Sequence, residues 1–153
     1  MRRLGILAVS LALALGSLAL PGSARAEGRT AVTWTRIAVP EGDDAAPLEK
    51  SLKKLLDKAA RKANFGKAKK LNLSVKVTTF SSEQKGDVHR VSCTIVGHIP
   101  GGPSAKSHIS FGGAPADRAK LEQQVLTMVS NAVVTRLAEI VRARAAKAEK
   151  DAE

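Results

Sequence analysis

Two histidines lie in a glycine-rich stretch, and both features can contribute to a binding site. The stretch GHIPGGPSAKSHISFGG covers residues 97–113 and places His98 and His108 near its two ends. Imidazole is a common metal ligand, and glycine-rich loops can hold phosphate groups. The stretch therefore raises three hypotheses, which are a metal site, a phosphate loop and a β-hairpin turn.

The order of the neighbouring segments favours the turn. A phosphate loop joins a strand to the start of a helix and carries a lysine and a hydroxyl residue at fixed spacing. Here PGGPS, residues 100–104, joins two segments in which apolar and polar residues alternate. Proline and glycine supply the backbone angles of a short turn, so we expect a hairpin whose turn is formed by residues 100–103.

The two histidines lack the partners of a metal site. Zinc is usually held by three or four ligands, and no carboxylate or thiolate is expected near His98 and His108. Lys106 would also repel a cation. We therefore predict no metal and no cofactor, and we keep a small-ligand or metal site around the two histidines as the alternative hypothesis.

Catalytic motifs are not evident in the sequence. Residues 51–54 match the Ser-x-x-Lys pattern of penicillin-recognising enzymes, but the chain is too short for that fold and lacks the companion motifs. There is no Gly-x-Ser-x-Gly pattern and no persuasive Cys/His pair. No motif identifies a protein family. We therefore predict that the protein is not an enzyme and has no catalytic residues.

Residues 1–26 have the composition of a secretory signal peptide. Arg2 and Arg3 precede a long apolar run, and the sequence ARA at residues 24–26 fits the small-x-small cleavage rule. The apolar run is short for a membrane span, which favours cleavage over an uncleaved anchor. We expect a mature chain that starts at Glu27, has no membrane span, and is periplasmic or secreted.

Cys93 is the only cysteine in the chain. An internal disulfide is therefore excluded, and no cysteine stands at the cleavage point to carry a lipid. Cys93 lies in a segment of alternating apolar residues. This position favours a small buried residue over a cross-link between two chains.

The spacing of apolar residues predicts the order strand, helix, three strands, helix. Residues 31–39 are rich in β-formers but alternate imperfectly, which indicates a bulge or a strand covered on both faces. Apolar residues recur at helical spacing over residues 48–63 and 121–141, and at alternate positions in three segments between them. A right-handed crossover would make the first two strands parallel. We therefore predict an α+β two-layer sandwich, in which a four-stranded mixed sheet carries both helices on one face.

One domain is expected, over residues 27–146. The length suits a single core, and the sequence shows no internal repeat and no linker. Residues 147–153 are charged and lack an apolar stripe, so we expect this C-terminal tail to fray.

Alternation also predicts which side chains share the uncovered face of the sheet. The apolar residues that alternate with polar ones in the last three strands lie at odd-numbered positions, so paired positions must keep odd with odd and even with even. Two registers satisfy this rule, one pairing His98 with His108 and the other pairing His98 with Lys106. Both place the two histidines on a polar, mildly basic face, whereas His89 has the wrong parity for it.

The same rule for the preceding hairpin places Lys76 beside Thr94, and Phe80 beside Arg90, on the uncovered face. An ordinary solvated face of an antiparallel sheet is the simpler interpretation of this surface. If it binds a ligand, the candidate residues are Lys76, His98, Lys106 and His108.

Positive charge is concentrated in residues 50–70. Outside residues 1–26 the chain has a net charge of +8, and residues 50–70 alone contain nine basic residues and one acidic residue. The rest of the mature chain is therefore balanced. The nine basic residues are Lys50, Lys53, Lys54, Lys58, Arg61, Lys62, Lys67, Lys69 and Lys70.

On a helix, the leucines of this segment gather on one side and its lysines on the other. A surface of one sign attracts anions, so we predict an exported, non-enzymatic binding module whose partner is an anionic envelope component or an acidic protein. Nucleic acid is disfavoured because the sheet lacks the aromatic residues that stack on bases. The alternative is a solvated lysine surface that only keeps the protein soluble.

Overall fold

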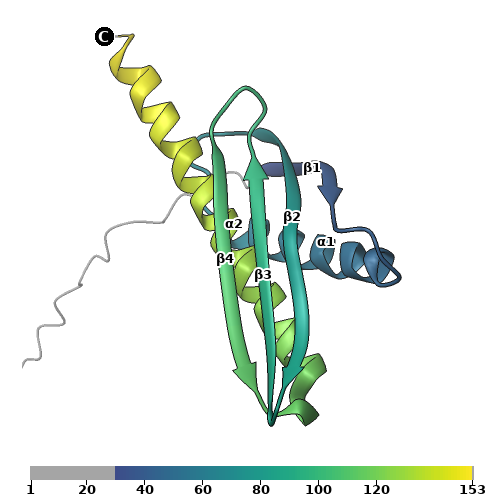
Figure 1. The fold of residues 1–153 in the computed structure, drawn as a ribbon. Coiled ribbons are helices and arrows are strands. Elements are labelled where there is room, and N and C mark those ends of the chain that lie inside the picture. Colours follow the sequence, from purple (N-terminus) through teal and green to yellow (C-terminus); the bar gives the residue numbers. More distant parts are fainter. Residues whose placement is uncertain (1–29, 153) are drawn as a thin grey trace, which may run out of the picture.

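The computed structural model describes residues 30–152 and consists of a sheet with two helices behind it (Figure 1). The α+β class and the order of elements are confirmed. The signal peptide predicted at residues 1–26 and the start of the mature chain at Glu27 lie outside the described residues. The elements are β1 (Ala31–Ala38), α1 (Ala45–Lys62), β2 (Lys70–Lys85), β3 (Val88–His98), β4 (Ser104–Gly113), the short 3-10 helix η1 (Pro115–Asp117) and α2 (Arg118–Lys150).

The sheet has the strand order β1-β2-β3-β4. β1 is parallel to β2, and the other neighbouring strands are antiparallel, so the predicted mixed sheet is confirmed. In Figure 1, β2, β3 and β4 run side by side as long strands, and β1 accompanies only one end of β2. Within residues 30–152, no helix is long and apolar enough to cross a membrane.

The core lies between the sheet and the helices. α2 packs on β3 and β4, and α1 packs on α2 and β1. Both helices therefore cover the same face of the sheet, as predicted. The fully buried aliphatic side chains come from all these layers and include Leu52, Leu56, Leu73, Val75, Val91, Ile95, Val125, Val129, Val133 and Leu137.

Gly97 allows α2 to lie close to the sheet. A β-carbon at this position would stand 2.7 Å from Leu137 Cδ1 and 3.1 Å from Val133 Cγ2. The turn of the same hairpin uses another glycine for its backbone angle, because Gly101 has a φ of 65°. Gly97 thus serves packing, and Gly101 serves the turn that the turn hypothesis predicts.

We predict that Gly97→Ala lowers the free energy of unfolding by about 1–3 kcal/mol, because the added methyl group must displace α2 side chains. Urea denaturation measures this change. Gly112→Ala is the matched control, since its methyl group would meet only the exposed Val88 side chain, at 3.1 Å, and ordinary contacts beyond. Equal stability of the two variants would show that the contact with α2 is not tight.

Cys93 is fully buried in the core, which confirms the prediction of a small buried residue. Burial raises the pKa of its thiol to about 12, so the reactive thiolate is absent at neutral pH. We expect a thiol reagent to label Cys93 only when urea unfolds the protein, at a rate set by unfolding. Rapid labelling of the native protein would contradict this placement and would favour a cross-linking role.

A bulge in β2 changes the face on which its later side chains lie. The register shifts between Val77 and Thr79, so one extra residue reverses the alternation. Phe80 then pairs with Cys93 and packs against the core. The prediction that Phe80 lies beside Arg90 on the uncovered face is therefore wrong.

The register of the last hairpin also differs from both predicted registers. His98 pairs with Ser104 and His108 pairs with Thr94, so His98 faces neither His108 nor Lys106. The reason is a shorter connection, because only the five residues 99–103 separate His98 from its partner, against seven in the nearer of the two predicted registers. Both histidines nevertheless lie on the uncovered face, and Thr94 Oγ1 lies 2.8 Å from His108 Nδ1.

α2 continues to Lys150. The fraying expected of residues 147–153 stays a prediction. Alanine, lysine, arginine and glutamate dominate its last turns and have high helix propensities, so the helix needs no apolar stripe there. An ion pair of 2.7 Å between Lys67 Nζ and Glu149 Oε1 also links this end to the loop after α1. The domain limits 27–146 stay a prediction.

Candidate functional site

The cations of α1 lie on its exposed side. Leu52, Leu56, Ala59 and Ala60 are buried, whereas every lysine and arginine of the helix is exposed. The predicted separation of apolar and basic residues around this helix is therefore present. We call the following residues the α1 basic surface: Lys50, Lys53, Lys54, Lys58, Arg61 and Lys62.

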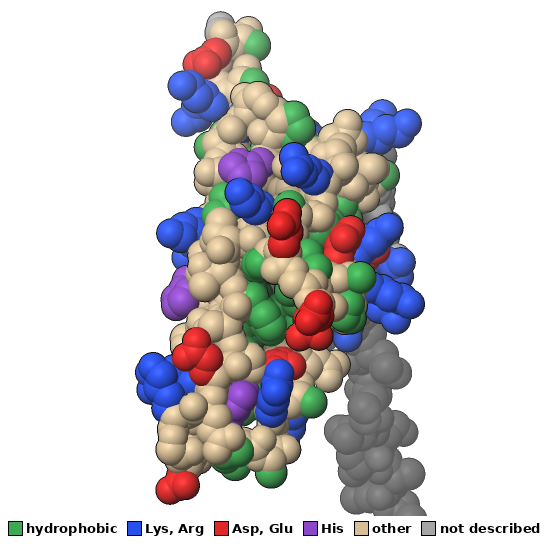
Figure 2. Space-filling model, turned by 45° about the vertical axis from the view of Figure 1, so that its right-hand side comes forward, with side chains coloured by type: hydrophobic (Ala, Val, Ile, Leu, Met, Phe, Trp, Pro, Cys, Tyr) green, Lys and Arg blue, Asp and Glu red, His purple; other side chains and the backbone are tan. Residues whose placement is uncertain are grey.

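Carboxylates do not neutralise this surface directly. The ion pairs among residues 30–152 are Lys67 with Glu149 and Arg118 with Glu122, and neither involves α1. α1 has two acids, Glu49 beside Lys50 and Asp57 between the other cations. Asp57 Oδ1 lies 3.0 Å from Trp34 Nε1, which donates a hydrogen bond that ties β1 to α1. Figure 2 shows Lys and Arg side chains gathered along the right-hand edge of the molecule.

The remaining predicted cations follow α1 in the chain. Lys67 forms the ion pair with Glu149, and Lys69 and Lys70 are exposed where the chain enters β2. The structure therefore brings six of the nine predicted residues onto one helix. The other three lie on the segment that leads to the sheet.

A second group of cations surrounds a hollow of about 230 Å³ on the uncovered face of the sheet. Arg36 of β1 pairs with Ser74 of β2, and Ser74 pairs with His98 of β3, so these three residues form one row across the sheet. Lys76 lies two residues further along β2, on the same face. These four residues line the hollow together with two apolar residues, and none of its described lining residues is acidic.

The structure unites only half of the predicted ligand residues. Lys76 and His98 line the hollow, but Lys106 and His108 do not. The prediction that Lys76 lies beside Thr94 is wrong, because Lys76 pairs with Val96. Val96 also pairs with Lys106 and therefore stands between the two lysines. In the part of the chain that the structure describes, no three His, Cys, Asp or Glu side chains gather as metal ligands do.

The sequence did not predict the contribution of Arg36. The register of β1 shifts between Trp34 and Arg36, which confirms the bulge suggested by its imperfect alternation. The shift leaves Trp34 against the core and turns Arg36 to the uncovered face. The irregular alternation was the available signal, but it did not locate the bulge.

A hydrogen-bonded cluster on the helix-covered face was also not predicted. Ser82 Oγ donates to Glu122 Oε1 at 2.5 Å and lies 2.8 Å from His89 Nε2. Arg118 Nε donates to the same carboxylate oxygen at 2.8 Å. The bulge in β2 is the cause, because it turns Ser82 to the face that buried His89 occupies.

This cluster differs from a nucleophilic triad in the direction of its hydrogen bonds. In a triad the histidine accepts the serine proton and the acid orients the histidine. Here the Ser82 hydroxyl uses its only hydrogen in the hydrogen bond to Glu122. In the second hydrogen bond Ser82 Oγ must therefore be the acceptor, and the protonated Nε2 of His89 the donor. The cluster joins β2, β3 and α2 beside a hollow of about 420 Å³ that Arg118 also lines.

Glu122 makes the stability of this cluster dependent on pH. Burial raises the pKa of Glu122, but hydrogen bonds from Ser82 and Arg118, with the charges of Arg118 and His89, outweigh it and hold this pKa below its ordinary value of 4.5. A depressed carboxyl pKa stabilises the folded state at neutral pH, and this contribution disappears as the pH falls through the folded-state pKa.

We therefore expect Glu122→Gln to lower the melting temperature at neutral pH. The difference from the wild type should shrink as the pH is lowered below 4.5. Thermal melts over a pH series measure this difference in melting temperature. Glu139→Gln is the control, because Glu139 is an exposed residue of the same helix. A difference that stays constant over the series would contradict the role of the Glu122 charge.

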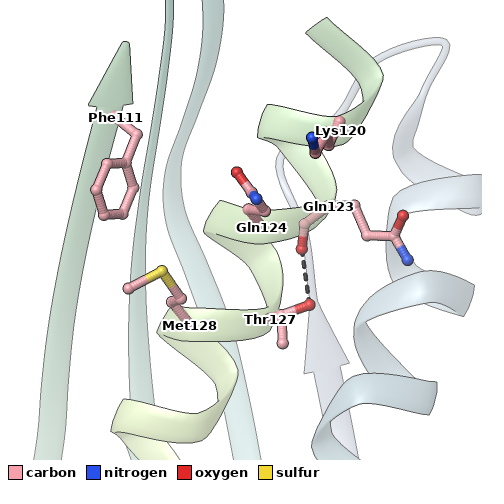
Figure 3. Close-up of a pocket in the computed structure, with 6 residues that line it drawn as sticks. All are labelled: Phe111, Lys120, Gln123, Gln124, Thr127 and Met128. Carbon is pink, nitrogen blue, oxygen red and sulfur yellow. Dashed lines mark hydrogen bonds between the residues drawn. The ribbon is translucent and has the colours of Figure 1, made fainter. Parts of the chain in front are cut away.

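A larger hollow, of about 530 Å³, lies between β4 and α2. Figure 3 shows Phe111 and Met128 next to one another there, and the hydrogen bond from Thr127 Oγ1 to the Gln123 carbonyl oxygen on α2. Phe111 is 43% exposed and Met128 is 44% exposed. Their apolar spacing predicted core positions, but α2 crosses the sheet obliquely and leaves this end of β4 partly uncovered (Figure 1).

Comparisons with known proteins show likeness only among solved structures. No family model and no curated protein matches the chain. A minor lipoprotein from Acinetobacter baumannii is 10% identical with a TM-score of 0.40, over 69% of this chain and 94% of that one. A PelC dodecamer subunit from Paraburkholderia phytofirmans is 14% identical with a TM-score of 0.44, over 72% of this chain and 89% of that one.

The rare lipoprotein B from Shewanella oneidensis is 11% identical with a TM-score of 0.31, over 76% of this chain and 97% of that one. Two of these three neighbours are thus named as lipoproteins of bacteria. Identities and TM-scores at this level are too low to transfer a function. The case for a function therefore rests on the residues of this chain.

Proposed function

We propose that this protein is an exported, non-enzymatic binding module, periplasmic or secreted, which contacts an anionic surface of the cell envelope through α1. The observation that carries the proposal is the α1 basic surface, whose cations are exposed and form no ion pair with the described carboxylates. Export is supported by the signal-like composition of residues 1–26. An acidic partner protein would use the same cations.

The spacing of the cations on α1 supports binding over mere solubility. Lys50, Lys54, Lys58 and Lys62 follow one another at intervals of four residues. Like charges at this spacing repel one another and destabilise a helix by a few tenths of a kcal/mol per pair. A surface that only kept the protein soluble would do better with both signs interspersed. An anion bound against this row would relieve the repulsion.

The expected strength of the contact follows from the number of charges. Each lysine or arginine close to an anionic membrane contributes about 1 kcal/mol, and the contribution falls off within a Debye length. Several cations on a single helix can approach such a surface together. Binding should therefore be strong at low salt and weaken steeply as salt is added.

We predict that reversing four charges of the surface abolishes binding to vesicles that contain anionic lipid. The variant is Lys53→Glu, Lys54→Glu, Lys58→Glu and Arg61→Glu, and its affinity at low salt should fall by at least about tenfold. Co-sedimentation with the vesicles measures the affinity, and vesicles of neutral lipid give the background.

The matched control reverses four exposed lysines elsewhere and so changes the net charge equally. It combines Lys85→Glu, Lys120→Glu, Lys147→Glu and Lys150→Glu, on β2 and α2. We expect this variant to keep most of the affinity. An equal loss in both variants would show that net charge alone drives the interaction, and the proposal would then be wrong.

Asp57→Asn tests the same surface in the opposite direction. Asparagine keeps an oxygen that can accept the Trp34 hydrogen bond, and the substitution removes the negative charge among the cations. We predict tighter vesicle binding with little change in melting temperature. Unchanged or weaker binding would argue against direct contact between α1 and the vesicle.

A further inference from the structure

We propose that the uncovered face of the sheet contains a separate binding site for a phosphate group, in the hollow formed by Arg36, Ser74, Lys76 and His98. This inference goes beyond the proposed function. The α1 basic surface belongs to the helix layer, whereas the hollow lies on the other face of the sheet. The two sites therefore use different residues and do not depend on one another.

The sheet fixes the positions of these residues. Arg36, Ser74 and His98 are successive partners across β1, β2 and β3. Neighbouring strands are about 4.8 Å apart, so the backbones of Arg36 and His98 stand about 10 Å apart with Ser74 between them. A ligand above Ser74 is thus within reach of long side chains from both sides. Positions on strands are held more firmly than positions on loops.

The chemistry of the four side chains suits an anion with several oxygens. Guanidinium and ammonium groups only donate hydrogen bonds, and the serine hydroxyl and the imidazole can donate as well. Among the described residues, Arg36, Lys76 and His98 form no ion pair, and no carboxylate lines the hollow. Figure 2 shows His, Lys and Arg side chains gathered in the upper part of the view, with a carboxylate nearby.

Phosphate fits this arrangement better than a carboxylate does. A tetrahedral phosphate presents its oxygens in several directions, so it can accept hydrogen bonds from donors on all three strands. A carboxylate presents only two oxygens, which lie in one plane. Arginine also binds phosphate oxygens in pairs. A hollow of about 230 Å³ lies below the usual volume of sites that enclose a whole small molecule, so it suits a phosphate head group whose remainder extends into solvent.

Titration of the full chain with inorganic phosphate, followed by NMR, tests the site. Sodium chloride is adjusted to keep the ionic strength constant, and chloride alone serves as the blank. We expect saturable shifts of the amide signals of Arg36, Ser74 and His98, with a Kd of about 1 mM or tighter. Shifts that do not saturate, or that are spread over all lysine-rich segments, would overturn the proposal.

A double substitution tests the donors, with a matched pair on the same face as control. Arg36→Gln with His98→Asn should raise the Kd for phosphate by at least about tenfold, because the guanidinium charge with its paired N–H donors and the imidazole of His98 are lost, and the shorter amide side chains do not replace them. Arg90→Gln with His108→Asn changes the same residue types away from the hollow and should leave the Kd unchanged. Equal effects of both pairs would contradict the site. The dispersion of the spectra verifies that each variant is folded.

The source of the phosphate is distinguished with vesicles that contain phosphatidic acid. If the double substitution at Arg36 and His98 also weakens vesicle binding, and inorganic phosphate competes, the natural ligand is a lipid head group. If it weakens phosphate binding alone, the ligand is a soluble phosphate compound. The charge-reversed α1 variant should keep its phosphate Kd, so a failure of the α1 proposal and a failure of this site give different results.

Discussion

The close packing of α2 on β3 is the constraint on which the rest of the structure depends. Gly97 leaves room for Leu137 and Val133, and α2 then covers the core residues of β3 and β4. α1 packs against α2 and β1 on the same side, so one face of the sheet is closed and the other is open to solvent. A sheet covered on one face must carry polar side chains on the other, and this requirement creates the surface on which Arg36, Lys76 and His98 meet.

Two bulges decide which side chains share each face. Each inserts one residue into a strand and reverses the alternation beyond it. In β1 the bulge brings Arg36 to the uncovered face, and in β2 it brings Ser82 to the helix-covered face, where Glu122 accepts a hydrogen bond from its hydroxyl. Both clusters are thus consequences of local irregularities that lie on neighbouring strands. Neither would exist in a sheet of regular strands.

Hydrophobic periodicity was enough to predict the element order and the exposed cations of α1, because both depend on the spacing of residue types within a segment. The parallel pairing of the first two strands and the common face of the helices followed from that order through the crossover and layer rules. The partner of His98 and the positions of Phe80, Ser82 and Arg36 depend instead on loop length and on where a strand bulges. Packing between segments determines loop length and the positions of bulges. The hollow on the uncovered face could therefore not be predicted from the sequence alone, although Lys76 and His98 were predicted as ligand residues.

The central claim is that α1 itself contacts an anionic surface. Chemical acetylation of lysines, read out by mass spectrometry with and without vesicles of anionic lipid, tests this contact residue by residue. The account predicts that vesicles protect Lys50, Lys54 and Lys58 of α1, while Lys85 and Lys120, which are also exposed, react at unchanged rates. Protection spread evenly over all these lysines, or protection of none of them, would contradict it.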